Sequence, residues 1–279
     1  MKKISRRSFL AAAGLSVAAL ALTACGGSSA STASSVASSA ASSEAASTSA
    51  AAGELATVEA GKLTMATNAA FPPYEMTTDA GEFEGIDIET AQAIADKLGL
   101  ELQIDDMDFD AALLSVQQGK ADIVMAGVTV TDERKAVMAF SDSYATGIQS
   151  IIVPEGSDIA SPDDLAGKKI GTQRGTTGYI YCSDDFGDDS VVAYDDGLTA
   201  VQALNNGQVD AVVIDNAPAK EFVAANPGLV ILDTSYAEED YAIGMAKGSS
   251  LEDAVNAALE ELKADGTLQS IVDKYITAE

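Results

Sequence analysis

The sequence predicts an α/β fold with parallel β-sheets, on three observations. Residues 123–126 (Ile-Val-Met-Ala) form an apolar run without alternation, as expected for a strand buried on both faces. Residues 86–98 have the apolar periodicity of an amphipathic helix and end at Gly99. Strand-like and helix-like segments alternate along most of the chain. The length of 279 residues is enough for one large or two small domains with buried cores.

The composition is strongly acidic. The chain has 43 Asp and Glu against 16 Lys and Arg, a formal net charge of −27 at pH 7. This charge argues against a nucleic-acid partner and against electrostatic attachment to anionic membranes. Histidine is absent, which removes imidazole metal ligands and His-dependent catalysis, so we expect no catalytic residue, metal or cofactor. Two cysteines, Cys25 and Cys182, predict no disulfide framework, and Cys182 is expected to be half-buried on a helix without a role.

The N-terminal segment predicts export. Residues 1–24 combine a basic start with an apolar run (residues 9–22) that is too short to span a bilayer comfortably, as in a signal peptide. Residues 22–25 (Leu-Thr-Ala-Cys) resemble a bacterial lipobox, which implies that Cys25 becomes the acylated, palmitate-type anchor at the outer face of the cell membrane. Residues 5–10 also resemble a twin-arginine signal, so both export routes stay open. Residues 25–59, rich in Ala and Ser, predict a flexible tether.

The first part of the folded body is predicted to begin near Gly61. Strands are expected at 62–67, 100–104, 122–126 and 149–153, and helices at 86–98 and 109–118. The prolines at positions 72 and 73 predict a loop over residues 68–74. A short helix is expected to begin at Asp132, with Thr131 as its N-cap.

The second part continues the alternation. Ser161 and Pro162 predict the start of a helix. Further strands are expected at 169–171, 190–194, 211–214, 229–232 and 241–246, and helices after Gly175 and at 197–205, 216–225, 251–264 and 268–276. Ligands of parallel α/β sheets bind at the carboxyl ends of the strands, where Asn68, Gly127 and Asp215 lie.

Arg134 is the most informative single residue. It lies near the start of a predicted helix, where the helix dipole disfavours a cation. An anionic partner would offset this, and a carboxylate fits the guanidinium best. The alternative, favoured on spacing alone, is an exposed side chain or a surface pair with Asp132 or Glu133.

Several motifs in order resemble the amino-acid-binding family of extracellular solute-binding proteins, the substrate receptors of ABC importers. The motifs are AGVTVTDERK (126–135) with FSDSY (140–144), FPPYE (71–75), GIDIETAQAIADKLG (85–99), LAGKKIGTQRGTTG (165–178) and DAVVIDNAPA (210–219). The resemblance implies a type II periplasmic-binding-protein-like fold, with two α/β lobes, a cleft and two crossing hinge strands near 146–148 and 241–243. Lobe 1 would comprise residues 60–148 plus 241–279, and lobe 2 residues 149–240. It also implies a monomeric receptor that delivers a free amino acid to the permease and ATPase subunits of an ABC transporter.

The resemblance also assigns roles to residues. The ligand carboxylate would be bound by Arg134, Thr129 and the amide of Thr177, at a helix N-terminus that favours anions. The ligand ammonium would be bound by Asp215 and the carbonyl of Gly127. The alternative for Asp215 is an N-cap of the next helix, and the two roles are compatible. The ligand side chain would contact Asn68, Phe71, Phe109 and Gln173.

The ligand class follows from these positions. Asn68 and Gln173 are neutral amides that donate and accept, and the motif positions supply no carboxylate beyond Asp215. A neutral polar amino acid, similar to glutamine or cystine, is therefore expected ahead of arginine, lysine or histidine. Two other functions stay open: a dehydratase-like enzyme acting on carboxylic acids with the same fold, and a surface adhesin or sensor.

Overall fold

The computed structural model describes residues 55–276. The predicted signal peptide, most of the predicted tether and the predicted lipidation residue Cys25 lie outside the described residues. Between residues 55 and 276, no helix has both the length and the apolar character needed to cross a membrane.

Within these residues the centre of the fold is a nine-stranded sheet. Its order is β5 (Glu101–Asp106), β1 (Lys62–Thr67), β6 (Ile123–Val124), β12 (Ala237–Ala246), β7 (Met138–Pro154), β10 (Ala211–Asp215), β8 (Ile170–Gln173) and β9 (Val191–Tyr194), while β11 (Leu229–Ile231) pairs with β7. β1 runs parallel to β5 and β6, and β8 runs parallel to β9 and β10. Each end of the sheet is thus a parallel α/β unit, which confirms the predicted class. We call the unit around β1 the first lobe and the unit around β8 the second lobe.

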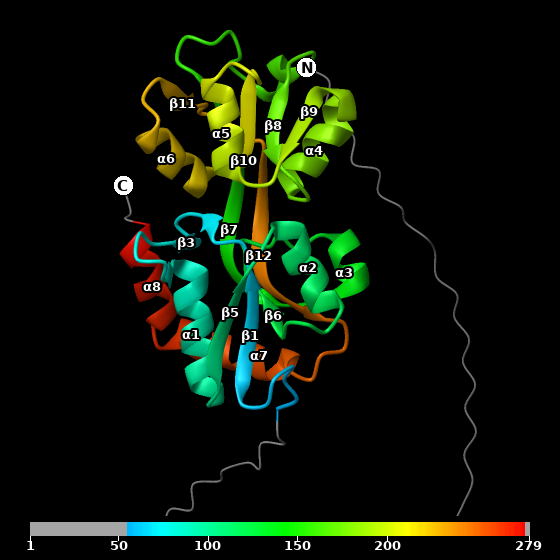
Figure 1. Ribbon diagram of the computed structural model, residues 1–279, viewed down its shortest axis with the longest axis vertical. Coiled ribbons are helices and arrows are strands. Elements are labelled where there is room, and N and C mark those ends of the chain that lie inside the picture. The colour runs from blue at the N-terminus through cyan, green and yellow to red at the C-terminus, as the bar shows by residue number, and fades with distance from the viewer. Residues whose placement is uncertain (1–54, 277–279) are drawn as a thin grey trace, which may run out of the picture. The chain divides into compact units, whose positions relative to one another are not determined.

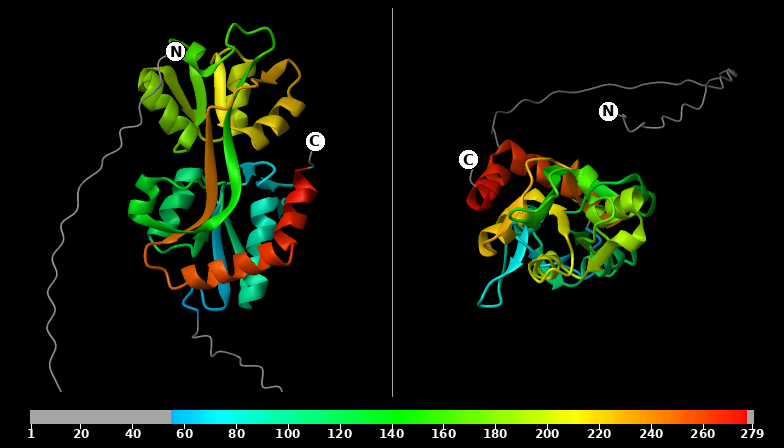
Figure 2. Two further views of the ribbon diagram at one scale, coloured as in Figure 1. Left: turned by 180° about the vertical axis from the view of Figure 1, so that it is seen from behind. Right: turned by 90° about the horizontal axis from the view of Figure 1, so that it is seen from above.

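The strands β7 and β12 connect the two lobes (Figures 1 and 2). They form one antiparallel ladder from Gln149 paired with Ala237 to Met138 paired with Ala246. β12 continues the sheet of the first lobe through β6, and β7 continues the sheet of the second lobe through β10. The predicted strand 149–153 and the crossing segment implied near 146–148 form only the last part of β7, because Ser141, Asp142 and Ser143 interrupt the apolar pattern before them and the pairing with β12 maintains the strand there.

Helices cover both lobes (Figure 1). The first lobe has α1 (Ile86–Leu98), α2 (Phe109–Gln117), α3 (Asp132–Val137), α7 (Glu252–Ala264) and α8 (Thr267–Tyr275). The second lobe has α4 (Thr177–Phe186), α5 (Gly197–Asn205) and α6 (Asn216–Ala225). In the first lobe, Ile94 of α1 and Leu259 of α7 are fully buried in one apolar core with Met65 of β1. This burial is the main stabilising contribution to the lobe, roughly 1.5–3 kcal/mol for each large apolar side chain.

Three local predictions need correction. The helix predicted at Ser161 and Pro162 is a short 3-10 segment (Pro162–Leu165), and the Ser161 hydroxyl bonds the Asp164 carboxylate instead of capping an amide. Cys182 of α4 is fully buried rather than half-buried, and burial raises the pKa of its thiol to about 12. The predicted loop 68–74 contains β2 (Ala70–Phe71), which forms a small sheet with β3 (Glu75–Thr77) and β4 (Phe83–Glu84).

Candidate ligand-binding site

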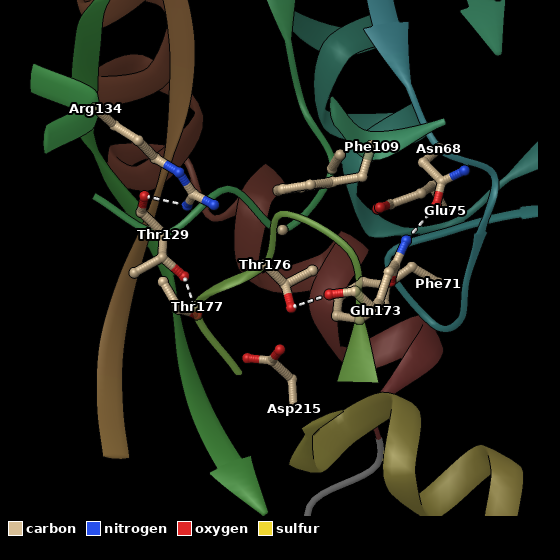
Figure 3. Close-up of a pocket in the computed structure, with 12 residues that line it drawn as sticks. Asn68, Phe71, Glu75, Phe109, Thr129, Arg134, Gln173, Thr176, Thr177 and Asp215 are labelled. Carbon is tan, nitrogen blue, oxygen red and sulfur yellow. Dashed lines mark hydrogen bonds between the residues drawn. The ribbon is translucent and has the colours of Figure 1, made fainter. Parts of the chain in front are cut away.

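One pocket lies between the two lobes, and the structure brings all nine predicted ligand-contact residues to it. The first lobe contributes Asn68, Phe71, Phe109, Gly127, Thr129 and Arg134, and the second contributes Gln173, Thr177 and Asp215 (Figure 3). Sequence reasoning missed three further lining residues, Glu75, Ala126 and Thr176. The pocket therefore combines buried groups of both charges with aromatic walls and two amides, as sites for small polar molecules do.

Arg134 spans the space between the lobes. The Thr131 hydroxyl caps α3 by accepting from the Arg134 amide at 3.2 Å, as predicted. The guanidinium is buried: Nη1 donates to the Thr129 carbonyl at 2.7 Å, and Nη2 donates to the Gly175 carbonyl at 3.1 Å. It also lies over the ring of Phe109, 5.4 Å from the ring centroid. Burial lowers the pKa of Arg134, but a guanidinium keeps its charge in proteins. The exposed alternative is therefore wrong.

Thr129 and Thr177 meet at a carboxylate that the sequence did not reveal. Oε2 of Glu239, on β12, accepts from the Thr177 hydroxyl at 2.8 Å and from the Thr129 hydroxyl at 3.3 Å. The same oxygen accepts from Gln149 Nε2 at 3.1 Å, and Oε1 accepts from the Tyr181 hydroxyl at 2.6 Å. Glu239 thus joins donors from both lobes. A possible signal was the alternation of β12, which places Glu239 on the same side as the buried Tyr241.

The start of α4 faces the same region. The Thr176 hydroxyl accepts from the Tyr179 amide at 3.4 Å, and Thr177 is the first helical residue. Both threonines line the pocket. The first amides of a helix of ten residues have no partner within the helix, so they are suited to an anionic group.

Asp215 ends β10 and is buried. It accepts from the Tyr241 hydroxyl and from Gln149 Nε2, the latter at 2.8 Å. Asp215 occupies the N-cap position of α6, as the alternative expected, but its side chain makes no capping hydrogen bond. Burial raises the pKa of Asp215 to about 6, although the bond from Tyr241 opposes the shift. A cationic ligand group next to Asp215 would stabilise its ionised form, which burial disfavours.

Gly127 allows a close approach between backbone and aromatic wall. Its φ of +54° lies in the left-handed region, and a Cβ here would come within 2.8 Å of the Phe71 ring. Its amide donates to Asp87 Oδ2 at 3.0 Å. A larger residue would therefore disturb both the backbone and the wall of the pocket.

Asn68 and Gln173 lie on opposite lobes and bond each other. Gln173 Nε2 donates to Asn68 Oδ1 at 2.8 Å, and Asn68 Nδ2 donates to the Met107 carbonyl at 2.9 Å. Phe71 and Phe109 are buried beside them. In Figure 3 Asn68, Gln173 and Phe71 lie apart from Arg134, Thr129 and Thr177, and Phe109 lies between the two groups, so the pocket has two chemically different ends.

Glu75 is the largest omission of the sequence analysis. It begins β3, has no exposed surface and lines the pocket. Its carboxyl group shares a hydrogen bond with the buried carboxyl group of Asp87, and burial raises the pKa of Glu75 well above its usual range. The sequence signal was weak, because a single acid at the end of FPPYE has no periodicity that distinguishes it from an exposed one.

Comparisons with known proteins show the family. The model of the bacterial extracellular solute-binding proteins, family 3, matches residues 63–278. The L-cystine-binding protein TcyJ of Escherichia coli (strain K12) is 33% identical over 226 residues, covering 79% of this chain and 85% of TcyJ. The arginine-, lysine-, histidine-binding protein ArtJ of Geobacillus stearothermophilus superposes with a TM-score of 0.75 at 34% identity, covering 78% of this chain and 96% of ArtJ.

A third similar structure is an ancestral arginine-binding protein bound to glutamine, with a TM-score of 0.75 and 41% identity over 78% of this chain and 99% of that protein. These relatives are solute-binding proteins rather than enzymes, so the dehydratase alternative has no support among them. Their fold is the type II architecture of two α/β lobes that the sequence motifs implied. Together, the match over residues 63–278 and the shared fold show that this chain belongs to the bacterial extracellular solute-binding proteins of family 3, which bind amino acids for ABC importers.

Proposed function

We propose that this chain captures a polar amino acid between its two lobes and delivers it to the permease and ATPase subunits of an ABC importer. One observation carries the proposal: Arg134 and Asp215, two buried groups of opposite charge on different lobes, line the same pocket. A zwitterion supplies a partner for each, and burial of an unpaired charge would otherwise be costly.

The proposed roles follow the two ends of the pocket. Arg134, Thr129 and the free amide of Thr177 bind the ligand carboxylate. Asp215 and the Gly127 carbonyl bind the ammonium. The walls Phe71 and Phe109 and the amides of Asn68 and Gln173 contact the side chain.

Closure of the lobes is part of the proposed mechanism. We assign residues 60–148 plus 241–279 to lobe 1 and residues 149–240 to lobe 2, with β7 and β12 as the hinge. Because the ligand contacts both lobes, it binds the closed state more tightly than the open one and shifts the population toward closure.

The proposed location depends on the N-terminal segment. Residues 1–24 act as the signal peptide, and Cys25 carries the lipid that anchors the chain to the outer face of the cell membrane. Residues 25–59 then form the tether, and the receptor acts as a monomer. Metabolic labelling with a palmitate analogue, lost in Cys25→Ser, tests this assignment.

The charge of the ligand side chain needs a separate argument. The preference for a neutral side chain remains a prediction, but its premise does not hold, because Glu75 supplies a second carboxylate to the pocket. The names of the relatives include cystine, arginine, lysine and histidine, and one is bound to glutamine, so they favour neither class.

A ligand screen tests the function. The melting temperature of the purified chain is measured with each of the twenty amino acids, followed by calorimetry and solution scattering. We expect at least one polar amino acid to raise the melting temperature and to compact the particle. The absence of a shift with any amino acid would contradict the proposed function. A tight ligand that leaves the scattering unchanged would contradict closure.

A further inference from the structure

Two acids beside the pocket share one hydrogen-bond donor. Gln149 of β7 is buried, and its Nε2 donates to Asp215 Oδ2 at 2.8 Å and to Glu239 Oε2 at 3.1 Å. A third contact, to the Thr177 hydroxyl at 3.4 Å, is longer. A side-chain amide nitrogen carries two hydrogens, so one serves each carboxylate. Gln149 is not among the residues that line the pocket, whereas Asp215 is, so an effect of Gln149 on the ligand passes through its neighbours.

The register of the sheet places Gln149 between these two acids. Asp215 lies directly opposite Gln149 in the antiparallel pairing of β10 with β7. On its other side Gln149 pairs with Ala237 of β12, and Glu239 follows two positions further along β12, on the same face. Direct and diagonal cross-strand neighbours are within reach of a long side chain. Gln149 therefore contacts both carboxylates from a strand that is paired on both sides.

The orientation of the Gln149 amide follows from its surroundings. With nitrogen and oxygen exchanged, Oε1 would face two carboxylates, which repel it. The observed orientation leaves Oε1 buried and without a hydrogen-bond partner among the described residues, close to Gly178 of α4, where an added Cβ would come within 2.9 Å. A buried acceptor without a donor costs free energy, and the two charge-assisted bonds from Nε2 offset that cost.

The charge of Asp215 depends on few donors. Burial raises the pKa of Asp215 to about 6, and the charge of Glu239 adds to this shift, while the hydrogen bonds from Tyr241 and Gln149 oppose it. Other ionisable groups near enough to interact with Asp215 are Arg134, Glu75 and Tyr74. Among the described residues, Gln149 is thus one of two side chains whose hydrogen bonds favour the charged form of Asp215, and it also lies between Asp215 and Glu239.

We propose that Gln149 is a positioning residue for ligand binding, which holds the ammonium-binding carboxylate of Asp215 in place and in its charged form and keeps it apart from Glu239. The proposal rests on the proposed function and adds a residue that acts through Asp215 rather than on the ligand. Without the Gln149 donor, a proton would compete with the ligand ammonium for Asp215 at a higher pH.

The variant Gln149→Met keeps the length of the side chain and removes both polar atoms. Because the unpartnered Oε1 is removed together with the donor, we expect the variant to fold, which circular dichroism checks. The midpoint of the pH dependence of affinity should rise by about one pH unit. Calorimetry with L-glutamine and with L-arginine, from about pH 5 to pH 8, should show a change of less than about threefold at pH 8 and a loss of about fivefold to tenfold at pH 6 and below.

Ile148→Met is the matched control. It places the same side chain at the adjacent position of β7, on the opposite, exposed face of the strand, and should leave the pH profile of the wild type unchanged. The carboxyl groups of Glu75 and Asp87 titrate in all of these proteins, so the difference between two profiles isolates Asp215. Tyr241→Phe removes the other side-chain donor to Asp215 and should move the midpoint in the same direction as Gln149→Met.

Urea unfolding of the ligand-free chain gives a second readout. A higher pKa of Asp215 in the folded state means that Gln149→Met loses more stability, relative to wild type, near pH 7.5 than near pH 4.5. In an Asp215→Asn background this difference between the two pH values should vanish. If Gln149→Met does not fold, ¹⁵N NMR of the wild-type chain decides, because the Nε2 hydrogens of Gln149 should shift with a midpoint near pH 6.

The outcomes separate this proposal from the proposed function. An equal loss of affinity at every pH in Gln149→Met would indicate a purely structural role and overturn the proposal, as would an unchanged profile or a flat NMR response of Gln149. If no amino acid binds the wild type, the proposed function fails and the role of Gln149 in ligand binding fails with it. That result differs from a wild-type chain that binds and a Gln149→Met profile that does not move.

Discussion

Arg134 of α3 donates from Nη2 to the carbonyl of Gly175 at 3.1 Å, a hydrogen bond that joins the two lobes. Gly175 immediately precedes the capped start of α4, so this bond brings the proposed carboxylate-binding arginine next to the helix N-terminus. The proposed anion site thus forms only when the lobes are together.

Arg134→Ala should weaken binding of the best ligand by about 2–5 kcal/mol, because it removes a desolvated partner of the ligand carboxylate. Calorimetry gives the loss, and circular dichroism checks that the fold is kept. The control is Arg174→Ala, since Arg174 is half exposed at 55% and pairs with Asp195 at 3.6 Å. Affinity of Arg134→Ala close to that of wild type would disprove the carboxylate role.

Gly175→Ala should hinder closure. The φ of Gly175 is +74°, and an added Cβ would overlap Oδ1 of Asp110 on the first lobe. Gly156→Ala is a matched control, because it has a φ of +82° and open space around it, and therefore introduces backbone strain alone. We expect both variants to lower stability by about 1 kcal/mol and only Gly175→Ala to lower affinity, by about tenfold or more. Partial recovery in Gly175→Ala with Asp110→Ala would identify the overlap as the cause, whereas full affinity in the single variant would exclude it.

Asp215→Asn should abolish tight binding and stabilise the ligand-free chain. The pKa of Asp215 is about 6 in the folded state against an ordinary 3.8, so stability present at low pH is lost as the pH rises through 6. A shift of this size corresponds to about 3 kcal/mol near pH 7.5, which the neutral Asn removes. Urea unfolding near pH 7.5 and pH 4.5 measures this, and the difference between variant and wild type should shrink at the lower pH. If the difference in unfolding free energy between variant and wild type is the same at both pH values, the ionisation of Asp215 is not its cause.

Affinity for a neutral amino acid such as glutamine should fall by about tenfold per pH unit below pH 6. The ligand ammonium binds the ionised Asp215, and its pKa of about 6 means that binding at pH 5 must first displace a proton. The chain contains no histidine, so the affinity should stay flat in the upper part of the range between pH 6 and pH 8. Calorimetry from about pH 5 to pH 8 tests this, with any residual binding of Asp215→Asn expected to lack the dependence.

Glu239→Gln should destabilise the ligand-free chain by about 1–3 kcal/mol, because four donors lose a charged acceptor and the new amide faces some of them. Glu238→Gln is the control at the adjacent, exposed position on the other side of β12. Urea unfolding of the two variants gives the comparison. Equal stability of the Glu239→Gln and Glu238→Gln variants would show that the charge of Glu239 adds nothing to its hydrogen bonds with Thr129, Thr177, Gln149 and Tyr181.

The sequence by itself determined most of the helices and strands, and it identified Arg134 and Asp215 as the residues proposed to bind the ligand's carboxylate and ammonium. The helices α5 and α6 begin and end at the predicted residues. Their apolar periodicity indicates the bounds correctly because both helices bury one apolar face against the sheet. Arg134 and Asp215 were identified through motifs whose spacing is local, within 126–135 and 210–219. The signal peptide remains a prediction from the composition of residues 1–24, and the lipid anchor at Cys25 remains a prediction from the resemblance of residues 22–25 to a lipobox.

The tertiary structure alone decided which acids are buried in or near the pocket. Glu75 and Glu239 are typical of exposed residues in the sequence, and both are buried, because strands distant in sequence place them between the lobes. The surroundings of the two groups differ: Glu239 accepts from four donors, whereas Glu75 shares a hydrogen bond with a second carboxyl group, that of Asp87. The four donors to Glu239 lie 58 to 110 positions away from it in the sequence, and no local pattern contains such contacts.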